Sequence, residues 1–311
     1  MKNHKPILFI TAGDPLGIGP EVTVKALQDK RVQKACTPIV IGEPNTLKKA
    51  GLTSDLASLL AVESTADKPT TIGPSKWGGE ISFKALKLAC KLAERYQTSV
   101  VTAPVSKQSW GKAGIDFTGH TEFLREYYGK TALMMFVSAD LHCALTTEHF
   151  SIKDVPNILT KNRIVQAGKD FADALKKLGI KNPHIAVSAL NPHNGDDGRF
   201  GREEKEVILP AIKALQKAKI HVQGPYPTDS LWDKHIKGHF DGILCMYHDQ
   251  ALLGLKLAAK KPVVHITAGL DFLRTSPTHG TAFDIAGKNQ ANPASMIEAI
   301  LFATTQYQSR L

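Results

Sequence analysis

Three histidines could hold a metal ion, because each follows a run with the composition of a β-strand. His149 ends LTTEH, His193 lies in LNPHNG, and His248 ends ILCMYH. Since the carboxyl ends of parallel strands meet at one edge of a sheet, we expect these imidazoles to converge. Three imidazoles with an open fourth position suit Zn²⁺ or a similar divalent ion acting as a Lewis acid. Asp229 and Asp249 could orient such ligands or form turns. The wide spacing matches no local metal motif, so unrelated histidines are the alternative.

The stretch Arg274–Pro293, RTSPTHGTAFDIAGKNQANP, predicts a long loop between a strand-like and a helix-like run. Ordered loops of this size are commonly functional. It carries His279, Gly280, Asp284 and Asn292. Glycine lets a ligand approach the backbone closely, and a carboxylate suits the paired hydroxyls of a ribose. An ordered turn capped by Asp and Asn is the alternative.

Two further loops follow expected strands. In FTGHTEFL, His120 and Thr121 stand at a helix entry, where Thr121 could cap the helix or both residues could bind an anionic substrate. In GDPLGIGPE, the spacing of Gly13, Gly17 and Gly19 does not match GxGxxG, so it does not support a Rossmann pyrophosphate loop. A structural turn is the favoured interpretation there.

Short β-branched runs alternate with amphipathic ones, which predicts an α/β architecture with mainly parallel strands. The expected strands are residues 7–11, 38–41, 99–103, 143–147, 184–189, 221–223, 242–246 and 262–267. Helices are expected at 81–96, 162–178 and 202–217, the last kinked at Pro210. Residues 52–74 have the composition of a surface excursion.

Composition argues against several classes of protein. The formal charge is +10, but the lysines are dispersed, so we do not expect nucleic-acid binding; a small anionic ligand explains the sign equally well. No apolar run is long enough to span a membrane. The four cysteines are scattered without CxxC spacing, as expected of reduced thiols in a cytoplasmic protein.

Seven ordered motifs covering nearly the whole chain resemble the PdxA family of 4-hydroxythreonine-4-phosphate dehydrogenases. They are GDPLGIGPE, TAPVSK, FTGHTEFL, LNPHNG, GPYPTDSLW, MYHDQALLGLK and RTSPTHGTAFDIAGK. The resemblance implies a two-lobed α/β/α fold like that of isocitrate and isopropylmalate dehydrogenases, with an inter-lobe cleft and no Rossmann fold. We expect residues 1–120 with 258–311 to form a nucleotide-loop lobe, and 121–257 a metal and dimerisation lobe.

The resemblance also implies a reaction. The family oxidises 4-phosphooxy-L-threonine at its C3 hydroxyl with NAD(P) and decarboxylates the product to 3-amino-2-oxopropyl phosphate, in vitamin B6 biosynthesis. It acts as a homodimer whose site is built by both subunits, with one divalent ion (Zn, Mg, Co or Mn). Its metal ligands fall on the three histidines above. Its substrate contacts fall on His120, Thr121, Lys256, the position of His265, and Arg274. Asp229 and Asp249 are the candidates for taking the hydroxyl proton.

Some residues depart from the family pattern. His265 stands where the family has asparagine, Leu16 replaces alanine, and residues 194–197 differ after His193. An imidazole lacks the donor–acceptor pair of an amide, so the substrate could instead be a 4-phosphothreonate-type acid or an aromatic cis-dihydrodiol carboxylate. In related decarboxylating dehydrogenases an aspartate at the place of Asp284 pairs with the adenosine ribose, which predicts NAD over NADP. A metal-dependent hydrolase and a non-catalytic binding protein are the rival classes.

Overall fold

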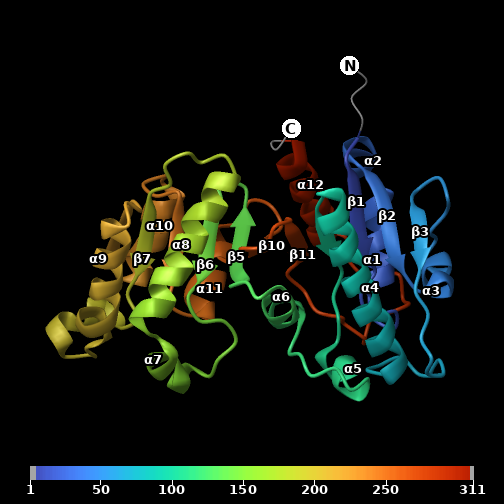
Figure 1. Cartoon of the computed structure of the whole chain (residues 1–311), viewed down its shortest axis with the longest axis horizontal. Coiled ribbons are helices and arrows are strands. Elements are labelled where there is room, and N and C mark those ends of the chain that lie inside the picture. Colours follow the sequence, from blue (N-terminus) through green and yellow to red (C-terminus); the bar gives the residue numbers. More distant parts are fainter. Residues whose placement is uncertain (1–4, 309–311) are drawn as a thin grey trace. The chain divides into compact units, whose positions relative to one another are not determined.

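The chain folds into two compact α/β units. The computed structural model describes residues 5–308, with helix assignment alone for 306–308. Unit 1 contains Met1–Lys130, Val264–Ile266 and Leu270–Leu311, and unit 2 contains Thr131–Val263 and Thr267–Gly269. Figure 1 shows that unit 1 combines the amino-terminal (blue) and carboxyl-terminal (red) parts of the chain. The lobe boundaries expected from the resemblance lay at 120/121 and 257/258.

Unit 1 is built on a largely parallel sheet. Its strands, in spatial order, are β3 (Ser58–Ala61), β2 (Thr37–Gly42), β1 (Ile7–Thr11), β4 (Val100–Thr102), β11 (Arg274–Pro277) and β10 (Val264–Ala268), of which residues 264–266 belong to this unit. Parallel ladders join β3 to β2, β2 to β1, β1 to β4 and β4 to β11. Because such strands are covered by helices, they are nearly continuous in apolar residues.

Seven helices accompany this sheet within the described residues of unit 1. They are α1 (Gly19–Leu27), α2 (Lys30–Ala35), α3 (Pro44–Lys49), α4 (Lys76–Tyr96), α5 (Lys107–Lys112), α6 (His120–Tyr128) and α12 (Ala294–Gln308). Helix α4 begins where the Ser75 side chain accepts a hydrogen bond from the N–H of Gly78, and it packs against β1, β2 and β4. Its apolar side closes a core that includes Ile81, Ala85 and Trp110.

The strands of unit 2 lie in the order β5 (Leu133–Ser138), β6 (Leu141–Leu145), β9 (Gly242–Cys245), β7 (Ile185–Ser188) and β8 (Val222–Tyr226). Strands β5 and β6 pair antiparallel, whereas parallel ladders join β6 to β9, β9 to β7 and β7 to β8. Its helices are α7 (Val155–Ile158), α8 (Lys161–Lys177), α9 (Leu209–Lys217), α10 (Thr228–Ile236) and α11 (His248–Ala258). Short turns are η1 (Ile152–Asp154), η2 (Pro192–Gly198) and the π-helical η3 (Glu204–Ile208).

The structure confirms the α/β architecture and corrects several local predictions. Strands β3, β5 and β11 were not predicted, so residues 52–74 are not wholly a surface excursion and Arg274 lies in a strand, not in a loop. Strands β3 and β11 have only four residues each, and the apolar run of β5 shows no alternation, so its pattern does not distinguish a strand from a buried helix. The kink expected at Pro210 is a π-turn followed by α9, where proline occupies the first turn and needs no N–H partner.

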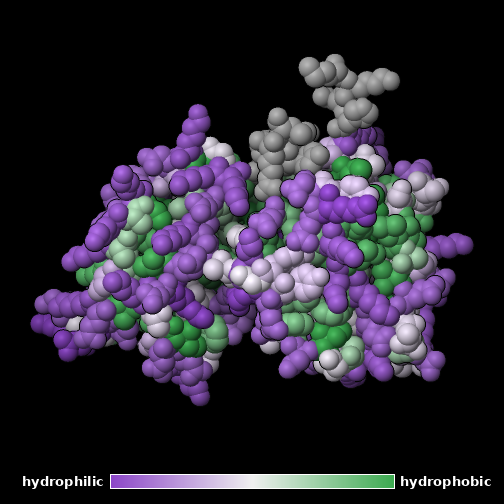
Figure 2. Space-filling view, viewed as in Figure 1, coloured by the Kyte–Doolittle hydropathy of each residue, from purple (hydrophilic) through white to green (hydrophobic). Residues whose placement is uncertain are grey.

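The surface mixes polar and apolar residues. In Figure 2 hydrophilic side chains are spread over the visible face, with apolar ones between them. Within residues 5–308, no helix is both long and apolar enough to cross a membrane. All four cysteines are buried and free, as expected, and burial raises the pKa of the Cys36 and Cys90 thiols to about 12.

Candidate active site

The three candidate metal ligands follow adjacent strands of unit 2. The strands run in the order β6, β9, β7 and pair in parallel, so their carboxyl ends share one edge of the sheet. His149 follows β6, His248 begins α11 directly after β9, and His193 follows β7. The predicted topological equivalence of these residues is therefore confirmed.

His149 and His248 lie side by side at this edge. Their ring centroids are 5.5 Å apart, which is compatible with two imidazoles directed at one ion. The Nδ1 atom of His248 is 2.7 Å from the Asp249 carboxylate. A carboxylate at that atom fixes the ring tautomer and leaves Nε2 as the coordinating nitrogen. Asp249 therefore has the geometry expected of a residue that orients a ligand histidine.

His193 stands apart from that pair, on η2. The ring centroids of His193 and Phe200 are 6.5 Å apart, and residues 193–197 all have positive φ angles. Within residues 5–308, no three His, Cys, Asp or Glu side chains form a group that could hold a metal. The structure thus brings together two of the three predicted ligands, and the third lies on a segment of sparsely populated backbone conformation.

Two buried residues that the sequence did not single out hold these strand ends in place. Gln250 accepts hydrogen bonds from the N–H of Met246 and the hydroxyl of Ser188, and donates to Ala189 and Thr228. It therefore ties the ends of β7 and β9 to the start of α10. The sequence signal that could have identified Gln250 is a polar residue near the start of a helix, on the side that faces the core.

Glu204 does the same for the segment that carries His193. Its carboxylate accepts hydrogen bonds from the backbone N–H groups of Leu190 and Asn191 and from the Asn191 side chain, at 2.7–2.9 Å. Glu204 is only 2% exposed. A Cβ atom on Gly195 would lie 2.7 Å from this carboxylate, which explains the glycine.

The predicted proton acceptors lie on the same side of unit 2. Asp229 is an exposed residue in the first turn of α10, which follows β8, the neighbour of β7. Asp249 is exposed in the first turn of α11. Lys256 is exposed near the end of the same helix. These three residues therefore belong to unit 2, whereas the other predicted substrate contacts belong to unit 1.

Arg274 is the most deeply buried charged group among the predicted substrate contacts. It is 2% exposed, and its Nε and Nη2 atoms donate to the Thr102 hydroxyl at 3.1 and 2.6 Å. Its Nη1 is 3.2 Å from Nδ1 of His265, which in turn lies 3.2 Å from the Ser276 hydroxyl. Burial lowers the pKa of Arg274 to about 10, so the guanidinium stays charged at neutral pH.

His120 and Thr121 occupy the first turn of α6. Burial, with smaller contributions from Arg274 and His265, lowers the pKa of His120 well below its usual value, so this imidazole is neutral. The expected helix cap is wrong: α6 begins after Gly119 without a side-chain cap, and Thr121 is buried inside the helix. The Glu122 carboxylate instead accepts a hydrogen bond from the N–H of Thr118.

The loop that carries the predicted cofactor residues rests on the glycine junction. The N–H of Ile18 donates to the carbonyl of Thr281 at 2.9 Å, and a Cβ on Gly17 would meet that carbonyl at 2.8 Å. Asp284 is exposed in this loop. His279 is half-buried, with Nδ1 3.1 Å from the carbonyl of Gly280. The junction is a turn, as predicted, and it also supports the loop.

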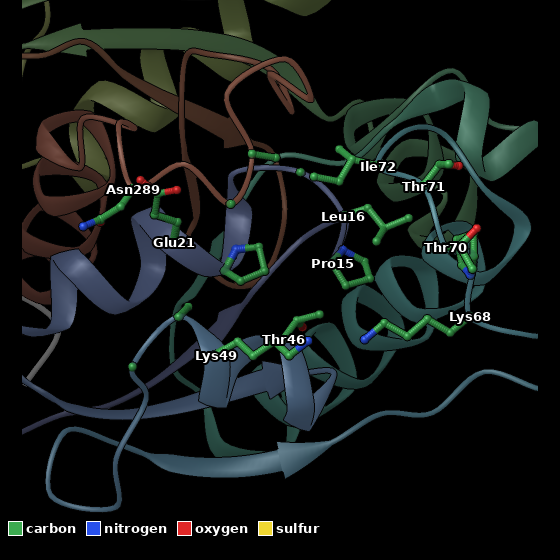
Figure 3. Close-up of a pocket in the computed structure, with 17 residues that line it drawn as sticks. Pro15, Leu16, Glu21, Thr46, Lys49, Lys68, Thr70, Thr71, Ile72 and Asn289 are labelled. Atoms are coloured by element: carbon green, nitrogen blue, oxygen red, sulfur yellow. The ribbon is translucent and has the colours of Figure 1, made fainter.

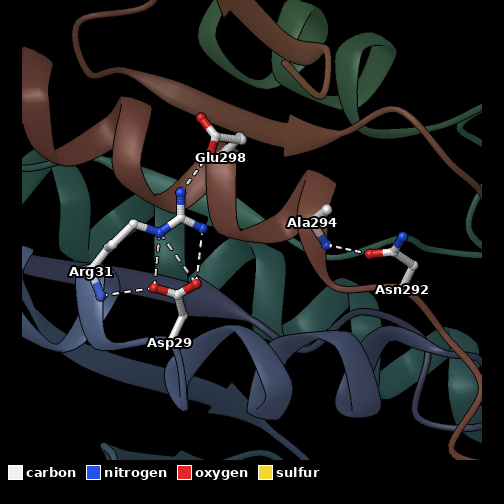
Figure 4. A network of polar contacts seen from close by, with 5 residues as sticks. All are labelled: Asp29, Arg31, Asn292, Ala294 and Glu298. Atoms are coloured by element: carbon white, nitrogen blue, oxygen red, sulfur yellow. Dashed lines mark hydrogen bonds and ion pairs between the residues drawn. The ribbon is translucent and has the colours of Figure 1, made fainter. Parts of the chain in front are cut away.

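Asn292 anchors the start of α12. Its side-chain oxygen accepts a hydrogen bond from the N–H of Ala294 at 2.9 Å (Figure 4). On the same helix, Glu298 pairs with Arg31 at 3.3 Å, and Arg31 pairs with Asp29, which caps α2. The oxygen of Asn292 is therefore engaged within the fold, and its amide N–H groups are the part that could meet a cofactor.

Comparison with known proteins places this geometry in a family. The sequence profile of the "Pyridoxal phosphate biosynthetic protein PdxA" family matches residues 34–303. A "Putative D-threonate 4-phosphate dehydrogenase" of Clostridium botulinum strain Hall is 34% identical, over 97% of each chain. A "4-hydroxythreonine-4-phosphate dehydrogenase" of Erythrobacter litoralis is 36% identical, over 95% of each chain.

The fold agrees with a solved structure as well. The crystal structure of 4-hydroxythreonine-4-phosphate dehydrogenase from Klebsiella pneumoniae superimposes with a TM-score of 0.87 and 31% identity. The match covers 97% of this chain and 99% of that one. The α/β fold predicted from the sequence is therefore confirmed.

Proposed function

The chain belongs to the PdxA family, and we propose that it is a metal-dependent, NAD-linked dehydrogenase of a phosphorylated hydroxy acid. As a member of this family it is an oxidoreductase. The proposed substrate is 4-phosphooxy-L-threonine, oxidised at its C3 hydroxyl. The β-keto acid that forms loses CO₂ and yields 3-amino-2-oxopropyl phosphate, a step toward pyridoxal 5′-phosphate. We also propose a cytoplasmic homodimer whose subunits both contribute to the site.

The buried guanidinium of Arg274 is the observation that best supports a phosphorylated acid as the substrate. A charged group at 2% exposure, held by Thr102 and His265, is oriented before any ligand arrives. Its planar fork suits a phosphate or carboxylate bidentately. Because His120 is neutral, it can donate or accept a hydrogen bond beside that anion without adding charge. Thr121 and, in unit 2, Lys256 are the further proposed contacts.

The paired imidazoles of His149 and His248 support a divalent-ion site at the unit 2 edge, which His193 would have to approach to complete. His149 and His248 would supply two nitrogens and His193 a third, with Asp249 orienting His248. When bound, such an ion would lower the pKa of the substrate hydroxyl and stabilise negative charge during decarboxylation. Zn, Mg, Co and Mn are the candidate ions, and imidazole ligands favour Zn or Co among them.

The chain's own residues would accept the proton and bind the cofactor. NAD would accept the hydride from C3. Asp229 or Asp249 would accept the hydroxyl proton, since both are exposed carboxylates beside the strand ends that carry the histidines. For the cofactor's adenosine half, we propose the loop with His279, Gly280, Asp284 and Asn292. Its position is set by Ile18 and Thr281.

A second substrate has specific support. A relative that is 34% identical is named a putative D-threonate 4-phosphate dehydrogenase, and His265 lies in contact with Arg274. An imidazole at that place offers a different hydrogen-bonding pattern from an amide. D-threonate 4-phosphate is therefore the alternative substrate for the same chemistry.

A coupled screen tests both substrates. Purified protein is incubated with NAD and each candidate, with and without added Zn²⁺, and reduced nicotinamide is followed at 340 nm. We expect turnover of one phosphorylated acid, abolished by EDTA and restored by metal. His248→Ala should lose both bound metal, measured by elemental analysis, and turnover; His239→Ala, which changes an exposed histidine, should lose neither.

The outcomes separate the rival classes. Phosphate release from either acid without any nicotinamide reduction would favour a metal-dependent hydrolase. Absence of turnover with every combination of substrate, metal and cofactor would favour a binding protein. Full activity of chelated His248→Ala protein would show that the metal assignment is wrong.

A further inference from the structure

The carboxylate of Asp14 is buried in unit 1 without a cation beside it. Asp14 lies in the glycine junction (residues 13–19) and is 0% exposed. Burial raises the pKa of this carboxyl group, while hydrogen bonds from Ser109 and Leu16 oppose the rise. Within the part of the chain that the structure describes, no lysine, arginine or histidine nitrogen lies within 4.0 Å of it. Carboxyl groups of this kind are often found at functional sites, and the proposed reaction gives this one no part.

One oxygen of the carboxylate shapes the turn that supports the loop proposed for the cofactor. Oδ1 accepts a hydrogen bond from the N–H of Leu16 at 3.1 Å, and the carbonyl of Asp14 accepts from the N–H of Gly17 at 3.0 Å. Both bonds close one tight turn, as aspartate side chains commonly do. The next N–H along the chain, that of Ile18, donates to the carbonyl of Thr281 at 2.9 Å. Thr281 belongs to that cofactor loop.

The other oxygen ties this turn to the starts of two helices. Oδ2 accepts from the Ser109 hydroxyl at 2.6 Å, and that hydroxyl in turn accepts from the N–H of Ser75 at 3.1 Å. Ser75 caps α4, and Ser109 lies in the first turn of α5. A Cβ atom on Gly78 would lie 2.6 Å from Oδ1, so only glycine lets the first turn of α4 approach the carboxylate this closely. Asp14 therefore fixes the junction against both helices.

Helix α5 extends the connection to a proposed substrate contact. Trp110, which follows Ser109, is fully buried, and its Nε1 donates to the Ser82 hydroxyl of α4 at 3.0 Å. The rings of Trp110 and His120 meet edge to face, with centroids 5.9 Å apart. His120 stands in the first turn of α6. A series of contacts thus joins Asp14 to the substrate histidine as well as to the cofactor loop.

The turn that Asp14 holds forms part of the wall of a cavity of about 670 Å³ (Figure 3). Pro15 and Leu16 come from this turn, and Asn289 of the cofactor loop also lines the cavity. Lys49 and Lys68 give the lining positive charge, which suits the phosphates of the proposed cofactor. A shift of the turn would therefore change a wall that the cofactor meets.

We propose that Asp14 is a positioning residue, whose carboxylate holds the cofactor loop and the His120 ring in place before either ligand arrives. This role rests on the proposed function, in which these two parts bind NAD and the phosphorylated acid. A loop or ring that is already ordered lowers the cost of binding. Without the carboxylate, each ligand must order its own contacts. Once both ligands are bound, they hold the loop and the ring themselves, so the chemical step is little affected.

Asp14→Asn tests this role in the kinetics of the full-length protein. The amide keeps one oxygen for the N–H of Leu16 and can turn its NH₂ to the Ser109 hydroxyl, so the fold should persist. We expect KM for NAD and KM for the phosphorylated acid each to rise about tenfold, with kcat changed less than about threefold. Ser109→Ala, which removes the same contact from the other side, should shift both KM values in the same direction. Glu43→Gln, a matched change at a buried carboxylate that caps α3, should shift neither.

A purely structural role gives a different kinetic pattern. Partial unfolding of Asp14→Asn would lower kcat per mole of protein and leave both KM values unchanged, and that result would overturn the proposal. A rise in KM for one ligand alone would overturn the joint role of Asp14.

Hydrogen exchange of the ligand-free protein, followed by mass spectrometry, needs no turnover. In Asp14→Asn we expect faster exchange in peptides that cover residues 15–19, 117–123 and 281–287, with unchanged exchange in β7 of unit 2. Glu43→Gln should speed exchange only around the start of α3. Unchanged exchange at residues 117–123 or 281–287 overturns the proposal. If the protein turns over neither candidate acid, the proposed function fails, while the exchange data still decide the role of Asp14.

Discussion

Burial sets the charge state of two polar side chains in unit 1, those of Arg274 and His120. It lowers the pKa of Arg274 to about 10 and that of His120 well below its usual value. The guanidinium therefore stays positive at neutral pH while the imidazole becomes neutral. One fixed cation beside a neutral hydrogen-bonding ring is a suitable arrangement for orienting an anion without repelling the rest of the substrate.

Arg274→Lys should lower kcat/KM for the phosphorylated acid about 10- to 100-fold. The change keeps a positive charge but removes the planar fork, so at least one charge-assisted hydrogen bond is lost. Steady-state kinetics under saturating NAD and metal give the measurement. Arg95→Lys, an exposed residue at the end of α4, is the matched control and should behave as the unchanged protein. An equal kcat/KM in the two variants would contradict an anion-binding role for Arg274.

Asp284→Ala should reduce discrimination between NAD and NADP. A carboxylate beside the adenosine ribose would accept from its hydroxyls and repel a 2′-phosphate, and the alanine does neither. The ratio of kcat/KM for the two cofactors is the measurement, with Asp271→Ala as a control at another exposed aspartate. Comparable kcat/KM values for NAD and NADP in the unchanged protein would count against the assignment, as would undiminished discrimination in the variant.

At the scale of elements, the geometry of the candidate metal site depends on how the carboxyl ends of β6, β9 and β7 are held in place. Gln250 links the ends of β7 and β9 with α10, and Glu204 fixes the turn before η2. Both are buried polar residues whose hydrogen-bonding groups meet backbone partners. Removing one would leave buried donors unsatisfied, which costs more than losing an exposed pair.

Glu204→Gln should destabilise the protein by about 1–3 kcal/mol. The new amide NH₂ cannot accept a hydrogen bond, so a backbone N–H of Leu190 or Asn191 would lose its partner. Urea unfolding followed by circular dichroism gives the change in the free energy of unfolding. Glu206→Gln alters an exposed partner of Arg202 and should cost less than about 1 kcal/mol. Zn²⁺ affinity should also fall in Glu204→Gln alone, since its turn carries His193.

At the scale of the whole molecule, several histidines are folded in their neutral form. Burial lowers the pKa values of His120 in unit 1 and of His142 and His235 in unit 2. His235 is 2% exposed; its Nε2 accepts from the N–H of His142, and its Nδ1 lies 2.9 Å from the carbonyl of Phe240. Protonation of Nε2 would place two donors against each other inside the core.

Stability should therefore fall as the pH is lowered from about 7 to about 5.5. The unfolded chain takes up protons at these histidines near pH 6.5 while the folded chain does not, so the free energy of unfolding decreases with decreasing pH. Each such group contributes at most about 1.4 kcal/mol per pH unit below its unfolded pKa. Urea unfolding at several pH values measures the slope. Replacement of His235 by Asn should reduce the slope of the free energy of unfolding against pH by the contribution of about one proton. A stability that is flat or rises toward pH 5.5 would contradict the expectation.

The sequence by itself determined the α/β class, most strands and helices, and the post-strand histidines, because these depend on local periodicity and on the end of a run. It also carried the family motifs. It could not show that β6, β9 and β7 are neighbours, since strand order is set by non-local pairing. Only the tertiary structure joined Arg274 to Thr102 and His265, buried Glu204 against the loop of His193, and placed Lys49 and Lys68 around one cavity. Those contacts depend on how the elements pack, and one of them, between Arg274 and Thr102, joins residues 172 positions apart.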